Sequence, residues 1–128
     1  MGDHSELDRT GKLLEALMGD RAGRTESFAE VQAVLAAGRT DVVVELPWYP
    51  DGGTHLIVLT HLEGDRIRCF NPLGHAGRSA GEILSDGPFR RRVEKDGSQS
   101  FLAADLEERF AAGEAAALLF KRRETDRR

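Results

Sequence analysis

The sequence of 128 residues predicts an α+β domain in which N-terminal helices pack on a small antiparallel sheet. Apolar residues recur at the helical period in the first 38 residues and again near residue 105. Between these two regions, β-branched runs alternate with turn residues, as in strands joined by tight turns. The length fits one domain that buries a core without disulfides, since the chain has a single cysteine, Cys69.

Two helices are expected before the sheet. The first spans residues 5–18, where leucines follow a helical period, and residues 19–24 after it are expected to form a loop. The second helix has clearer boundaries. Ser27 and Glu30 form a capping box at its start, and Gly38 ends it in the left-handed conformation.

Three strands are expected in the middle of the chain. Residues 41–46 form a β-branched run that ends at a proline, and residues 48–53 form a turn-rich loop. Residues 54–61 are apolar on both faces, as in a central buried strand, while residues 66–71 alternate between apolar and polar. Residues 63–65 between these two strands predict a hairpin turn.

The C-terminal part is expected to complete the sheet. Residues 89–94 are a candidate strand, residues 102–112 a helix, and residues 115–120 a last strand, although the alanines of that segment also suit a helix. A single domain therefore spans residues 1–120, and residues 121–128 form a basic tail.

Charge and hydropathy exclude several classes of function. The net charge is −4, and residues 87–128, with 10 basic and 8 acidic side chains, are the only part in which positive charge gathers. The arginines at positions 90–92 and the basic tail are interpreted as solvated surface, and no nucleic-acid partner is expected. No apolar run is long enough to span a membrane, and the first residues lack the pattern of a signal peptide, so a cytoplasmic protein is expected.

The predicted hairpin brings together side chains that can do chemistry. A loop centred on Glu63 places residue i opposite residue 126 − i, which pairs His55 with Asn71. Directly opposed residues have Cβ atoms roughly 4.5–5.5 Å apart, close enough for an amide to orient an imidazole as a general base. The pairing holds only for a turn centred there, and a lone strand histidine is more often a core or surface residue.

The loop before His55 can form one wall of a binding cleft. Gly53 lets backbone or substrate approach closely, and Trp48 and Tyr49 supply apolar contacts. No metal site and no cofactor are expected. His55 and His61 share one face of a strand but lie roughly 20 Å apart, and the glycines of the chain do not form a phosphate-binding loop.

The string THLIVLTHLEGDRIRCFNPLG resembles the His-to-Asp segment of papain-like cysteine peptidases of the double-glycine leader peptidase family, which mature bacteriocin and pheromone precursors. His55 matches the family's catalytic histidine, and the Asn-Pro pair at Asn71 matches its orienting residue. Residues 42–46 resemble the strand before the histidine, and residues 100–120 resemble the closing helix and strand. The resemblance implies a papain-like cysteine-peptidase fold in which Asn71 orients His55.

The nucleophilic cysteine of that family has no counterpart at the expected place. The family carries it at the start of its first long helix, and Thr10 matches that position. A threonine hydroxyl is far less acidic than a thiol, and residues 1–9 lack the glutamine that builds the family's oxyanion hole. Cys69 could approach His55 from the strand face that it shares with Asn71, but a buried strand cysteine usually acts as a small hydrophobe.

The leading hypothesis is a degenerate papain-like domain that binds an extended peptide or a protein partner, without cleaving it, between the first helix and the His55 hairpin. The alternative is an active papain-like hydrolase in which Thr10, Cys69 or a partner-supplied nucleophile works with His55 as base and Asn71 as orienting residue. A third hypothesis is an interaction subunit whose basic C-terminal third, with residues 121–128, grips an acidic partner.

Overall fold

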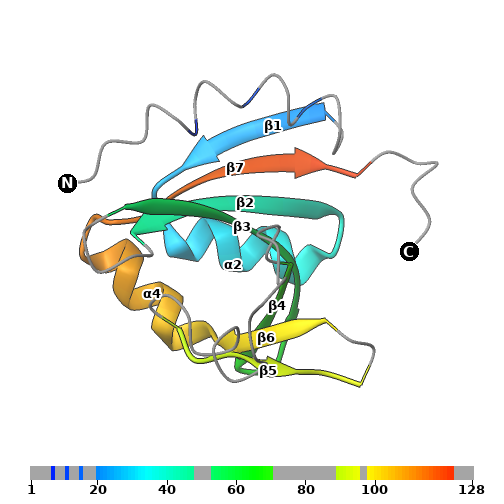
Figure 1. Cartoon of the computed structure of the whole chain (residues 1–128). Coiled ribbons are helices and arrows are strands. Elements are labelled where there is room, and N and C mark those ends of the chain that lie inside the picture. Colours follow the sequence, from blue (N-terminus) through cyan, green and yellow to red (C-terminus); the bar gives the residue numbers. More distant parts are fainter. Residues whose placement is uncertain are drawn as a thin grey trace, which may run out of the picture.

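The computed structural model of the chain describes residues 20–47, 53–70, 89–95 and 98–122, together with Leu7, Gly11 and Glu15. Its strands are β1 (Asp20–Thr25), β2 (Thr40–Pro47), β3 (Thr54–Glu63), β4 (Arg66–Phe70), β5 (Arg92–Val93), β6 (Gln99–Leu102) and β7 (Ala116–Lys121), and its helices are α2 (Phe28–Ala37) and α4 (Ala103–Ala111). The described strands form one seven-stranded sheet in the order β1-β7-β2-β3-β4-β6-β5, in which all neighbours are antiparallel (Figure 1). The predicted α+β class with an antiparallel sheet is confirmed.

Apolar side chains cover both faces of the sheet. Helices α2 and α4 pack on one face, which we call the helix face, and the rings of Phe28 and Phe110 lie 6.1 Å apart between the two helices (Figure 1). The other face, which we call the opposite face, carries a second buried cluster that includes Leu7. Leu7, Gly11 and Glu15 are helical, and the other residues of the predicted first helix lie outside the described residues.

Strands β2 and β7 lie side by side and are buried on both faces of the sheet. In β2, Val42 and Val44 pack on the helix face and Val43 on the opposite face, and β7 meets them with leucines and alanines. Fully burying a valine or leucine side chain stabilises the folded state by about 1.5–3 kcal/mol, so the buried side chains of β2 and β7 contribute strongly to the stability of the sheet. The strands predicted at residues 41–46 and 115–120 are thereby confirmed.

Of the two hydrogen bonds that make up the capping box predicted for α2, the one to the Ser27 side chain is formed. The Ser27 hydroxyl accepts a hydrogen bond from the Glu30 backbone N–H at 3.3 Å, as expected. The Ser27 backbone N–H donates to the Thr25 hydroxyl at 3.0 Å, so Thr25 takes the role that the glutamate plays in a full capping box. Gly38, with a φ of 78°, donates its N–H to the Leu35 carbonyl and ends the helix where the sequence predicts.

Two strands are absent from the sequence prediction. The loop predicted at residues 19–24 is wrong, because Asp20–Thr25 form the edge strand β1, with a bulge between Arg21 and Gly23. The strand β6 precedes α4 and was not expected, and the strand predicted at residues 89–94 is limited to β5. Pairing with β7 stabilises β1, and pairing with β4 and β5 stabilises β6, so distant segments rather than local patterns specify both.

The folded domain extends past the predicted start of the basic tail. Lys121 is the last residue of β7, and the Arg122 backbone N–H donates to the Arg39 carbonyl at 3.0 Å. The Arg122 guanidinium also lies 2.8 Å from the Asp41 carboxylate. Lys121 therefore belongs to the sheet and Arg122 is held at its end by these contacts, while residues 123–128 lie outside the described residues. None of the described helices is long and apolar enough to cross a membrane.

Candidate functional site

The turn of the β3–β4 hairpin is not centred where the sequence prediction put it. Glu63 pairs with Arg66, so the turn consists of the two residues Gly64 and Asp65. Gly64 has a φ of 63°, and no other described residue of the hairpin has a positive φ. A glycine at the first position of a two-residue turn is typical of type II′ hairpins, whose twist matches that of the strands.

A bulge in β3 then shifts the ladder once more. Beyond it Leu59 pairs with Cys69, whereas the predicted register pairs Leu59 with Ile67. The register prediction is therefore wrong, and the geometric reason for expecting His55 opposite Asn71 is lost. Asn71 itself lies outside the described residues.

His55 lies near the start of β3, on the helix face of the sheet. It pairs with Leu46, which belongs to the core on that face, and its side chain is half-buried. Leu7, in the described part of the first helix, packs on the opposite face, so it does not lie beside His55. Gly53 directly precedes β3 and is half-buried. The other predicted site residues, Thr10, Trp48, Tyr49 and Asn71, lie outside the described residues.

Cys69 is buried in the core of the helix face and does not approach His55. Its partner Leu59 lies four residues along β3 from His55, which corresponds to roughly 13 Å. The residue is 3% exposed, and burial raises the pKa of its thiol from 9.0 to about 11 against a smaller opposing effect of the Arg91 charge. Cys69 is thus protonated at neutral pH, and the prediction that it could approach His55 is wrong.

His61 does not share a face with His55, contrary to the sequence prediction. The bulge in β3 reverses the alternation, so His61 pairs with Arg68 on the opposite face while Leu62 packs against the helix-face core. The exposed His61 ring has its Nδ1 atom 3.1 Å from the Thr60 hydroxyl. Within residues 20–47, 53–70, 89–95 and 98–122, no group of three His, Cys, Asp or Glu side chains could hold a metal ion.

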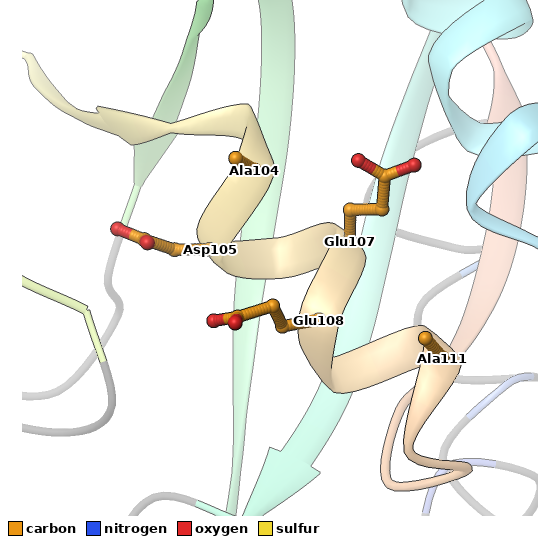
Figure 2. A pocket seen from close by; sticks show the side chains of 5 residues that line it. All are labelled: Ala104, Asp105, Glu107, Glu108 and Ala111. Atoms are coloured by element: carbon orange, nitrogen blue, oxygen red, sulfur yellow. The ribbon is translucent and has the colours of Figure 1, made fainter.

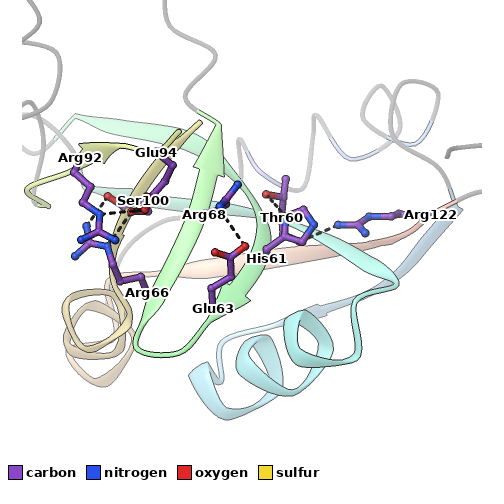
Figure 3. A network of polar contacts seen from close by, with 9 residues as sticks. All are labelled: Thr60, His61, Glu63, Arg66, Arg68, Arg92, Glu94, Ser100 and Arg122. Atoms are coloured by element: carbon purple, nitrogen blue, oxygen red, sulfur yellow. Dashed lines mark hydrogen bonds and ion pairs between the residues drawn. The ribbon is translucent and has the colours of Figure 1, made fainter. Parts of the chain in front are cut away.

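A polar cluster on the opposite face of β4, β6 and β5 is a candidate site that the sequence prediction did not contain (Figure 3). Ser100 lies at its centre. Its hydroxyl donates to the Glu94 carboxylate at 2.6 Å and accepts from Arg66 Nε at 2.9 Å. Arg66 Nη2 donates to the Ser100 carbonyl at 3.0 Å, and Arg92 Nε donates to the Glu94 carboxylate at 3.1 Å.

Part of this cluster is readable from the sequence. Alternation along β4 puts Arg66 and Arg68 on one face, and Arg68 forms an ion pair with Glu63 at 3.1 Å. Arg92 joins the cluster only because β6 lies between β4 and β5, and β6 has no clear local signal. The alternation of Arg66 and Arg68 along β4 is the signal in the sequence that indicates a basic surface.

The Glu94 carboxylate and the arginines at positions 90–92 differ in their burial and in their contacts. The hydrogen bond from Ser100, followed by the one from Arg92, lowers the pKa of Glu94, so this carboxylate stays ionised beside the arginines. Arg90 and Arg92 are exposed, as predicted for the arginine triplet, but Arg91 between them is only 4% exposed. The prediction that all three arginines are solvated surface is therefore wrong for Arg91.

A shallow hollow with a volume of about 470 Å³ lies along α4 (Figure 2). Two small side chains and three acidic ones line it, namely Ala104, Ala111, Asp105, Glu107 and Glu108. In Figure 2, Glu107 points away from the other two carboxylates, so the three acidic groups do not converge on one point. We assign no site to this hollow.

The resemblance to leader peptidases thus remains an expectation that the local sequence around His55 and Asn71 carries by itself. Comparison with known proteins adds nothing to it. No protein-family model matches the chain, and no curated protein and no solved structure is significantly similar to it.

Proposed function

We propose that this chain is a degenerate papain-like domain that binds a peptide or protein partner without cleaving it. The separation of Cys69 from His55 is the observation that carries the proposal. The sole thiol of the chain is buried with a pKa of about 11, and roughly 13 Å of strand separate its ladder position from that of His55. A thiol peptidase needs a thiolate beside its histidine.

Thr10, at the position that matches the family's nucleophile, is a poor replacement for the missing thiol. Threonine nucleophiles generally use their own free amine as base, and an internal threonine has none. The upstream glutamine of the family's oxyanion hole is also missing. Both departures favour binding over hydrolysis.

The order of the elements supports a papain-like fold for this domain. Strand β2 precedes the strand that carries His55, β4 follows it after a tight turn, and α4 and β7 close the chain. The resemblance around His55 leads us to expect this order. We propose the cytoplasm as the compartment, because a chain with a single cysteine forms no disulfide within itself.

We propose that the partner binds at the connection between β2 and β3. Gly53 and His55 flank the start of β3, and both are half-buried, so a bound segment could reach the imidazole there. Trp48 and Tyr49 of the same connection are expected to add apolar contacts. The role of His55 would then be to hydrogen-bond to the partner rather than to activate a nucleophile.

One sample tests both halves of the proposal. A fluorescein-labelled double-glycine leader peptide is mixed with the chain, its anisotropy reports binding, and mass spectrometry reports cleavage. We expect saturable binding of an intact peptide, weakened about fivefold to tenfold in His55→Ala through the loss of one hydrogen bond. His61→Ala is the matched control, since His61 is exposed on the opposite face. Cleavage that disappears in His55→Ala would contradict the proposal.

A further inference from the structure

A row of polar side chains that includes two arginines and a histidine, which we call the basic row, crosses four strands on the opposite face of the sheet. Arg92 of β5 and Arg68 of β4 both pair with Ser100 of β6, and Arg68 also pairs with His61 of β3. Paired residues in neighbouring strands share a face, so these four side chains lie in one line across the sheet. With strands roughly 4.8 Å apart, the two arginines are about 10 Å from each other.

Polar contacts fix the arginine side chains in the basic row and beside it. Ser100 fixes Arg66 through two hydrogen bonds, at 2.9 and 3.0 Å, and fixes Glu94, which in turn accepts from Arg92 Nε. The Arg92 side chain is 60% exposed, and its two Nη groups donate to none of the described residues. Because Glu94 holds the guanidinium through Nε, the outer Nη donors are oriented before any ligand arrives.

Apolar side chains flank the row on the same face. Phe70 pairs with Val58, whose side chain packs on the opposite face, and Leu102 pairs with Arg66. Phe70 is 62% exposed and Leu102 is 41% exposed, and they are two of the three large hydrophobic residues that are exposed in the described part of the chain. Exposed aromatic and aliphatic groups beside arginines are typical of protein-binding surfaces.

We propose that this face, formed by β4, β6 and β5 with His61 of β3, binds an acidic segment of a partner protein that also carries apolar residues. The exposed Arg92, whose Nη groups donate to none of the described residues, matches a carboxylate of the partner. Arg66 and Arg68, which contact Ser100 and Glu63, add positive charge beside it, and Phe70 and Leu102 match apolar side chains of the partner. A nucleic acid fits less well, because the chain has a net charge of −4 and the described face offers one exposed aromatic ring for base stacking.

This surface is separate from the proposed site at the β2–β3 connection. His55 lies on the helix face, whereas the basic row lies on the opposite face. Binding of an acidic segment therefore depends on the arginines and not on His55. The two proposals can fail independently, since His55→Ala should leave acidic-peptide binding unchanged.

The test uses a fluorescein-labelled peptide rich in glutamate that carries one phenylalanine and one leucine. We expect saturable binding to the full chain that weakens about tenfold or more when NaCl is raised well above physiological ionic strength. Arg92→Glu should weaken binding at least tenfold and, by reversing the charge, should improve binding of the same peptide with lysine in place of glutamate. Phe70→Ser should weaken binding about threefold to tenfold without changing the salt dependence.

The matched control is Arg24→Glu, because Arg24 lies in β1, at the edge of the sheet opposite to β5, and like Arg92 it pairs with a glutamate two residues along the chain. It should leave binding of the glutamate peptide within twofold of the wild type. Equal weakening by Arg24→Glu and Arg92→Glu would overturn the proposal, since it would show a response to net charge alone. An unchanged affinity in Arg92→Glu, or tighter binding of a single-stranded oligonucleotide than of the peptide, would also overturn it. Thermal unfolding of Arg92→Glu and the milder Arg92→Gln checks that both variants fold.

Discussion

Arg122 forms a buried ion pair with Asp41 that joins the end of β7 to the start of β2. The Arg122 Nη2 and Nε atoms lie 2.8 and 2.9 Å from Asp41 Oδ1, and the side chains are 14% and 1% exposed. The same guanidinium donates to the Gly38 carbonyl at 2.9 Å and to the Thr60 carbonyl at 2.8 Å. One side chain thus connects the end of α2, the bulge of β3 and two central strands.

Arg122→Ala should lower the free energy of unfolding by about 3 kcal/mol, because it removes the guanidinium that forms the ion pair with the buried Asp41 carboxylate. Urea unfolding of the purified chain measures the change. Lys121→Ala is the control, since Lys121 is exposed at the adjacent position and its loss should have little effect. A double variant with Asp41→Asn should lose less than the sum of the two single changes, and strict additivity would show that the ion pair contributes nothing.

The sequence predicts the elements whose signals are local. Ser27 and Gly38 mark the ends of α2, and the valine run marks β2. A short stretch of sequence is therefore enough to predict each of these two elements. The sequence predicts a loop where β1 forms, because Asp20–Thr25 has no apolar alternation and pairs with a strand at the other end of the chain. The fold class is therefore readable, while the edges of the sheet are not.

Gly64→Ala should destabilise the chain by about 1–2 kcal/mol, because alanine pays a steric cost at the φ of 63° that the hairpin turn requires. Gly23→Ala is a useful comparison. A Cβ at Gly23 would lie 3.8 Å from Leu119 Cδ1, an ordinary contact at a φ without strain, so its effect should be small. Thermal unfolding of both variants checks the difference, and equal effects would count against the assigned turn.

Glu94 should make the stability of the chain depend on pH in the acidic range. Its pKa is lowered in the folded state from the ordinary value of 4.5, first by the Ser100 hydrogen bond and then by Arg92. Stabilisation by this carboxylate is thus present above pH 4.5 and is lost as the pH falls through the folded-state pKa. The unfolding free energy of Glu94→Gln, measured across this range, should show a weaker pH dependence than that of the wild type. Identical profiles for the two proteins would refute the role of Glu94.

Cys69 should have the converse effect at alkaline pH. Burial raises the pKa of its thiol in the folded state from 9.0 to about 11, so the folded state holds the proton more tightly than the unfolded state. The contribution of this thiol to the free energy of unfolding is fully present below pH 9.0, and it should fall by on the order of 2–3 kcal/mol as the pH rises to about 11. Cys69→Ala removes the titrating group, so the alkaline loss should be smaller in this variant. A loss of the same size in both proteins would show that other groups cause it.

The candidate site was harder to predict than the fold, because its geometry depends on single residues of register. A turn centred on Glu63 would pair His55 with Asn71, but the chain turns at Gly64 and Asp65 and then forms a bulge. Since strand side chains alternate with a period of two, the bulge also moves His61 to the face that His55 does not occupy. The pair Gly64-Asp65 is a local signal for a two-residue hairpin turn that the prediction of a turn centred on Glu63 does not use, whereas the bulge has no such signal.

The rate at which iodoacetamide alkylates Cys69, measured against pH, tests most directly the claim that the chain has no working thiol and imidazole pair. We predict that the folded chain is inert near neutral pH, that its rate rises with an apparent pKa near 11, and that His55→Ala leaves the profile unchanged. A control in denaturant should label at the rate of an ordinary thiol. Fast labelling of the folded chain at neutral pH, with an apparent pKa below 8.5 that rises in His55→Ala, would contradict the account.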